Sequence, residues 1–155
     1  MPNLQHNALS LALPQGWEDG SQVIALGPQD GGFRPNLVFS QEPVKAGENS
    51  AQFAARQLPQ LKQALTGYVL VKEGAAKFGN NSGFLREHAF KMEKSEIGQL
   101  QFYVVNGGTA FTFTFTHLKP KLAAAKPTAE KLFTQAKLGA GGGGSGRAGS
   151  DTADF

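Results

Sequence analysis

Hydrophobic and polar residues alternate most regularly along residues 97–116, where two runs meet at Asn106-Gly107-Gly108. Asn-Gly and Gly-Gly pairs supply the positive φ angles that tight hairpin turns need, and an alternation of two residues is the period of a β-strand. The stretch therefore predicts a β-hairpin with one aromatic face and one polar face. We expect the aromatic face to pack in the core against the helices, and its members are Leu100, Phe102, Val104, Phe111, Phe113 and Phe115.

Shorter patterns of the same kind predict strands at residues 8–13, 21–26, 36–41, 68–72, 75–78 and 84–92. Residues 27–35, between two of these strands, are rich in Gly, Pro and Asp, a composition typical of loops. Trp17 directly follows the turn Pro14-Gln15-Gly16. We expect its large ring to cover the core as a lid, and a platform for a ligand is the alternative.

The first helix is predicted to begin after Asn49, because Asn at the cap with Gln52 three residues later forms a capping box. An apolar periodic run follows, and Thr66-Gly67 marks the end of the helix. Pro59 lies inside this run, so we expect a kink or a break near Ala55.

A second amphipathic helix is predicted at residues 128–138, after Pro120, Pro127 and an Ala-rich stretch. The composition then changes to a Gly-rich sequence without apolar periodicity, which predicts a flexible tail or linker at residues 139–155. Three alternatives are open for this tail: a natural low-complexity end, the tether to a further domain, or an engineered spacer. The folded domain is therefore expected to span residues 1–138. Its elements predict an α+β fold, a mostly antiparallel, twisted sheet of about six strands packed by two helices.

Composition limits the partners of the protein. The 155 residues give room for one domain, and 40% hydrophobic content with 12 Phe is enough for a core. The net charge of +3 is spread along the chain, which is typical of a solvated surface and not of a nucleic-acid site. The chain has no Cys, which excludes disulfides, thiol catalysis and Cys-ligated zinc. With no signal-peptide pattern and no long apolar run, we expect a cytoplasmic protein without stable membrane association.

Candidate chemistry is sparse. The three histidines, His6, His88 and His117, have no metal-ligand spacing, and no phosphate-binding or nucleophile motif is present. His88 lies in the middle of a predicted strand, where a hydrogen-bonded structural histidine is favoured over a general base. We therefore expect no enzymatic activity, no cofactor and no metal, with a small enzyme of unrecognised site as the weakest alternative.

The polar face of the sheet is not cleanly polar, because Ile24, Tyr103 and Val105 appear beside Gln22 and Gln101. Such a face is either buried by a dimer partner or by loops, or it forms a groove for a hydrophobic helix or peptide. In the second case apolar side chains supply affinity and glutamines satisfy polar atoms of the guest.

The order of several segments resembles the DcrB-related family, whose cytoplasmic members include the Eag chaperones of type VI secretion. The segments are LPQGWEDGSQVIAL, PNLVFSQEPV, the helix at residues 50–65 followed by GYVLVKEG, then FLREHAF and QLQFYVV. The similarity covers about residues 8–138. Ser40-Gln41 stands where the family often has a basic residue, and the glycine tail lies outside the family pattern.

The resemblance implies a PsbP-like sandwich that forms a homodimer and has no catalytic activity. It also implies a chaperone that holds the hydrophobic N-terminal transmembrane segments of a secretion effector and loads it for export. A generic DcrB-like domain that uses its second face only for dimerisation is the alternative. The client-binding residues that the resemblance implies are Gln22, Ile24, Leu37 or Phe39, Gln57, Leu61, Gln101 and Tyr103.

Overall fold

The computed structural model describes residues 3–139 of the chain, and in this range it contains eight strands and two helices. In chain order these are β1 (Asn3–His6), β2 (Leu9–Ala12), β3 (Val23–Leu26), β4 (Asn36–Pro43), α1 (Ser50–Ala64), β5 (Val69–Phe78), β6 (Asn81–Met92), β7 (Ser95–Asn106), β8 (Thr109–Leu118) and α2 (Lys119–Gln135). Neither helix is long and apolar enough to cross a membrane. Of the tail predicted at residues 139–155, only Gly139 lies within the described residues.

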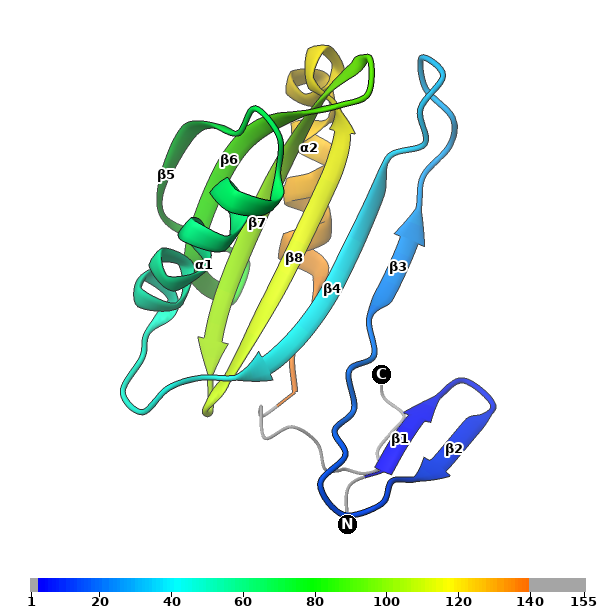
Figure 1. Ribbon diagram of the computed structural model, residues 1–155, viewed down its shortest axis with the longest axis vertical. Coiled ribbons are helices and arrows are strands. Elements are labelled where there is room, and N and C mark those ends of the chain that lie inside the picture. Colours follow the sequence, from blue (N-terminus) through cyan, green and yellow to red (C-terminus); the bar gives the residue numbers. More distant parts are fainter. Residues whose placement is uncertain (1–2, 140–155) are drawn as a thin grey trace.

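Six strands form one antiparallel sheet in the order β3-β4-β8-β7-β6-β5, with β3 and β5 at its edges (Figure 1). The predicted hairpin lies near its centre as β7 and β8, and Gly107 and Gly108 have the positive φ angles expected of the turn. The predicted α+β class with about six strands and two helices is therefore confirmed. The two short strands expected at residues 68–78 are one strand, β5, with an irregularity between Leu70 and Lys72.

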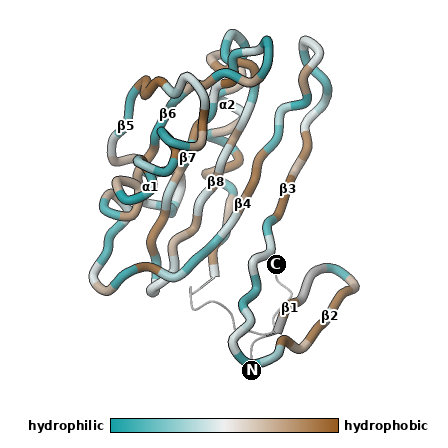
Figure 2. Tube along the Cα trace, viewed as in Figure 1, coloured by the Kyte–Doolittle hydropathy of each residue, from teal (hydrophilic) through white to brown (hydrophobic). Residues whose placement is uncertain are grey.

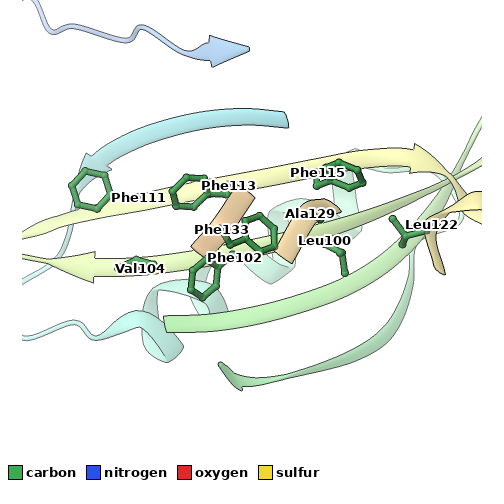
Figure 3. Packing of buried hydrophobic residues seen from close by; sticks show 9 residues of the cluster. All are labelled: Leu100, Phe102, Val104, Phe111, Phe113, Phe115, Leu122, Ala129 and Phe133. Atoms are coloured by element: carbon green, nitrogen blue, oxygen red, sulfur yellow. The ribbon is translucent and has the colours of Figure 1, made fainter. Parts of the chain in front are cut away.

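The core lies between the sheet and α2. Its aromatic centre is formed by Phe102, Phe113 and Phe133, whose ring centroids lie 5.3 to 6.1 Å apart (Figure 3). The cluster of buried residues comprises Leu100, Phe102, Val104, Phe111, Phe113, Phe115, Leu122, Ala129 and Phe133. The aromatic face of the hairpin is thus core, as its alternation predicted.

The two helices cover opposite faces of the sheet (Figure 1). Helix α2 packs on the aromatic face, whereas α1 packs on the other face through Phe53 and Ala54 against Tyr103 and Ala110. The expectation that both helices lie over the aromatic face was wrong. An amphipathic pattern says which side of a helix is buried, but not which face of the sheet it meets.

Helix α1 begins at the predicted capping box, where Asn49 and Gln52 exchange hydrogen bonds of 2.8 and 2.9 Å. It runs without a break to Ala64, although Pro59 lies inside it. The carbonyl group that Pro59 cannot pair belongs to Ala55, whose side of the helix is exposed. Water can therefore satisfy this carbonyl group, and the expected break does not occur.

Helix α2 begins nine residues before the predicted start, at Lys119. Pro120 occupies the first turn, where a missing N–H group costs nothing, and Pro127 lies in the helix interior on the exposed side. The prolines and the Ala-rich stretch, which we expected to precede the helix, form its first half.

The N-terminal segment differs most from its prediction. Strand β1 was not predicted, and it pairs with β2 in a separate hairpin that stands away from the six-stranded sheet (Figure 1). Trp17 is 63% exposed, so in this structure it is not the core lid that we expected.

Candidate functional site

The face of the sheet that carries α1 is only partly covered. Helix α1 packs against β6, β7 and the start of β8 at Ala110, and it leaves the rest of β8, β4 and β3 uncovered on this side (Figure 1). Residues opposite one another in neighbouring strands share a face, so the strand register identifies the uncovered side chains. We call this surface the open face; its members are Ile24, Leu26, Asn36, Val38, Ser40, Thr112 and Thr114, and the buried Thr116 lies at its inner margin.

The outer part of the open face is apolar. Ile24 and Leu26 are 58% and 56% exposed, and the half-buried Val38 lies opposite Ile24 in the next strand. Figure 2 shows the hydrophobic character of β3 at the sheet edge. Edge strands are normally covered or carry charged side chains, because an exposed apolar edge promotes association. Their exposure therefore marks the open face as a candidate binding surface.

The inner part of the open face is a ladder of amide and hydroxyl groups. The Nε2 atom of Gln99 donates to Oγ1 of Thr116 at 3.0 Å, and Nε2 of Gln101 donates to Oγ1 of Thr114 at 3.2 Å. Each threonine hydroxyl accepts one of these bonds and keeps its own hydrogen to donate. The ladder thus holds polar groups in a row from β7 to β8. It places no charged group beside the apolar outer part of the open face.

His88 holds the β7 end of this ladder. Its Nε2 atom lies 2.7 Å from Oε1 of Gln99, and its Nδ1 atom lies 3.0 Å from the hydroxyl of Tyr68. Because Oε1 only accepts, Nε2 carries a proton, and in the neutral ring Nδ1 accepts from the Tyr68 hydroxyl. Burial lowers the pKa of His88, and the bond to Gln99 opposes this shift only in part. Both ring nitrogens are engaged, so the histidine orients Gln99 and offers no free base.

Arg86 joins α1 to the sheet beside the ladder. This side chain is 1% exposed and donates to Glu73 at 2.9 Å, to the Tyr103 hydroxyl at 3.0 Å and to the Ala54 carbonyl at 3.0 Å. The Tyr103 hydroxyl in turn donates to Gln101. Burial raises the pKa of Tyr103 to about 12, so the phenol keeps its proton. The position of α1 and the orientation of Gln101 are therefore set by one network.

The predicted client-binding residues divide into three groups. Ile24 lies exposed on the open face, Gln22 is exposed directly before β3, and Gln57 and Leu61 are half-buried on α1. Gln101 and Tyr103 lie on the same side of the sheet, but they are 8% and 1% exposed, and Tyr103 packs beneath α1. These two residues are buried beneath the open face and contribute little exposed surface to it.

Leu37 and Phe39 lie on the opposite face, which corrects their expected position. They pair with Phe115 and Phe113 and pack against the core under α2. Val38, which was not predicted, takes their place on the open face. The alternation of β4 was visible in the sequence, but a one-residue choice of face decides every assignment on a strand.

Comparisons with known proteins support this fold. The DcrB family model matches residues 9–135, and a search of curated proteins finds no match. The structure is similar to that of PA94, a Pseudomonas aeruginosa protein of unknown function, with a TM-score of 0.72 and 19% identity over 89% of this chain and 96% of that one.

A second similar structure is PsbP (CyanoP) from Synechocystis sp. PCC 6803, with a TM-score of 0.50 and 12% identity over 64% of this chain and 65% of that one. At these identities the likenesses describe the fold alone, which is PsbP-like. The family match spans most of the sequence, from the start of β2 to the end of α2. The chain is therefore a member of the DcrB family.

Proposed function

We propose that this protein is a cytoplasmic chaperone and adaptor of the Eag type, without catalytic activity, that holds the apolar N-terminal helices of a type VI secretion effector and loads it for export. The observation that carries the proposal is the open face, where exposed Ile24 and Leu26 lie beside a hydrogen-bonded Gln and Thr ladder. Apolar side chains bind a hydrophobic guest, and neutral polar groups pair with its backbone or its small polar side chains.

The open face can hold part of such a guest. On its central strand, β4, it spans Asn36 to Ser40, which is about 13 Å at ~3.3 Å per residue. A transmembrane helix of ~20 residues is about 30 Å long. Covering ~1,000 Å² of its apolar surface contributes about 25 kcal/mol before the costs of ordering and association are subtracted. A helix lying along β8 and β4 would contact Ile24 and Val38 on one side and α1 on the other.

The absence of charge on the ladder also favours this type of guest. A charged group in contact with an apolar helix would lose its hydration without a partner, which is costly. Amide and hydroxyl groups that already form hydrogen bonds with each other lose much less hydration free energy when a guest covers them. Arg86, which lies near the ladder, is buried, and each of its guanidinium nitrogens is hydrogen-bonded below the surface.

Co-expression tests the proposal. The N-terminal segment of the effector encoded beside this gene is expressed with and without the chain, and its soluble fraction and co-purification are measured. We expect the segment to be insoluble alone, and soluble and bound when the chain is present. A segment that stays insoluble and unbound would contradict the proposal for that client.

A further inference from the structure

Strand β3 carries the outer part of the open face, but the fold holds it in place at few points. It lies at the edge of the six-stranded sheet, and among the described strands it pairs with β4 alone. All four of its residues are exposed, so none of them is anchored in a core. Beside α2 lies a groove of about 510 Å³, whose walls include Ala25 of the strand and Ala124 and Ala125 of the helix. The position of β3 therefore depends on what holds its ends.

The C-terminal end of β3 continues into a turn that folds back toward β4. We call this segment, residues 27–35, the tip (Figure 1). Asp30 and Phe33 form a β-bridge across Gly31-Gly32. Both glycines have positive φ angles, 66° and 83°, as the central residues of a tight two-residue turn require. The tip is thus an ordered extension of the β3–β4 hairpin.

Asp30 ties the tip to the start of α2. Its Oδ1 atom accepts a hydrogen bond of 2.8 Å from Nζ of Lys121, and its Oδ2 atom lies 3.0 Å from Nε2 of His117. The Nδ1 atom of His117 accepts from the N–H of Leu118 at 2.7 Å, so Nε2 carries the ring proton and donates it to Asp30. Lys121 and His117 both lower the pKa of Asp30, which keeps the carboxylate charged at neutral pH. We call Asp30, His117 and Lys121 the clamp.

The tip also packs closely on this corner of the fold. The ring of Phe33 stacks on the ring of His117, with centroids 5.8 Å apart. A Cβ atom at Gly31 would lie 2.7 Å from Cε of Lys121, so glycine lets the lysine lie directly against the turn. His117 is 1% exposed, so the clamp is built on a side chain that is itself fixed in the fold.

We propose that Asp30 is a positioning residue for the client surface, because the clamp fixes the tip against α2 and thereby holds Ile24 and Leu26 of β3 in the plane of the sheet. This inference rests on the proposed function, since it concerns the same surface. Leu26 directly precedes the tip and lines the groove. Without the clamp, β3 keeps only its pairing with β4, and its apolar side chains turn away from Val38 toward the groove. A guest that spans both strands then binds less tightly.

Hydrogen exchange tests the clamp without any client. The Gly27 N–H donates to the Pro35 carbonyl at 2.8 Å, so its exchange rate reports how often the tip end of β3 opens. In Asp30→Ala we expect this amide to exchange about five times faster, while the amides of β6 and β7 keep their rates. Gln29→Ala, which removes the exposed neighbouring side chain, should leave the rate at Gly27 unchanged. Equal rates at Gly27 in Asp30→Ala and the wild type would overturn the proposal.

A double variant tests whether Asp30 acts through Lys121. Lys121→Ala alone should speed exchange at Gly27, and it should add little in Asp30→Ala, where the ion pair is already lost. Lys119→Ala, exposed and two residues earlier, is the matched control and should have no effect. Effects that multiply in the double variant would contradict a shared clamp.

Co-purification of the effector's N-terminal segment tests the link to the open face. We expect the amount bound to fall several-fold in Asp30→Ala and to stay at the wild-type level in Gln29→Ala. Asp30→Glu keeps two carboxylate oxygens for the same donors, so it should restore most of the binding. Faster exchange at Gly27 with unchanged binding would overturn the positioning role. A wild type that binds no segment would contradict the proposed function instead, and the exchange rates would still decide whether the clamp holds β3.

Discussion

At the scale of single residues, the candidate site rests on two buried polar side chains that never reach the surface. His88 orients Gln99, and Arg86 orients Tyr103 and through it Gln101. Every nitrogen atom of the two side chains takes part in a hydrogen bond, which is how a buried polar group avoids its desolvation cost. The polar groups on the open face are therefore held in place by residues that a guest would not contact.

The neutral state of His88 makes stability depend on pH. Burial lowers the pKa of His88 in the folded protein, whereas the unfolded chain takes up this proton near pH 6.5. The unfolded state therefore binds more protons below that value, and the free energy of unfolding falls as the pH drops below about 6.5. Urea unfolding between pH 7.5 and 5 measures this decline. His88→Gln should show a shallower decline, and an equal slope in both proteins would exclude His88 as its source.

Arg86 should contribute more to stability than an arginine that is only partly buried. Arg86→Leu leaves the Tyr103 hydroxyl and the Ala54 carbonyl without their partner, and we expect a loss of about 2–4 kcal/mol in the free energy of unfolding. Arg56→Leu is the control, since the side chain of Arg56 is 28% exposed and its ion pair is with Glu48 alone. Thermal and urea unfolding of both variants measure the difference. A larger loss for Arg56→Leu would contradict the role given to Arg86.

At the scale of elements, β6 and β7 approach each other unusually closely at Gly83. A Cβ atom there would lie 2.0 Å from the Tyr103 carbonyl oxygen, whereas at Gly74 on β5 it would meet nothing within 4 Å. Gly83→Ala should therefore lower the free energy of unfolding by about 1–3 kcal/mol or more, because a backbone must shift. Gly74→Ala should be neutral or stabilising by up to about 1 kcal/mol. Equal effects in urea unfolding would argue against the close approach.

Most elements could be predicted from the sequence, because their signals are local. The alternation at residues 97–116 identified the central hairpin, and the pair Asn49 and Gln52 identified the start of α1. The first half of α2 was missed because Pro120 and Pro127 normally end helices, and both here occupy positions where the lost N–H group is tolerated.

The candidate site was less predictable, because it depends on non-local packing. Alternation gave the correct side of the sheet for Ile24 and Gln101. Alternation does not predict that α1 covers Tyr103. It also does not predict whether Val38 or its neighbours Leu37 and Phe39 lie on the open face. Only the pairing of β4 with β8, which lie about seventy residues apart in sequence, settles that choice.

At the scale of the whole molecule, the two faces of the sheet carry different surfaces. The face with α1 carries the open face that we assign to an apolar client, and the face with α2 is covered by that helix over the aromatic core. At the β3–β4 edge, Leu26 and Asn36 of the open face also line a groove of about 510 Å³ beside α2.

Capture of an apolar helix by the open face is the central claim, and two adjacent residues of β3 test it most directly. Ile24 and Val23 are 58% and 50% exposed, but they point to opposite faces of the sheet. Each is replaced by Asp, and co-purification of the effector's N-terminal segment is measured with both variants. We predict that Ile24→Asp loses the segment and that Val23→Asp retains it, with both proteins folded. Retention by Ile24→Asp, or loss by Val23→Asp alone, would contradict the assignment of the open face.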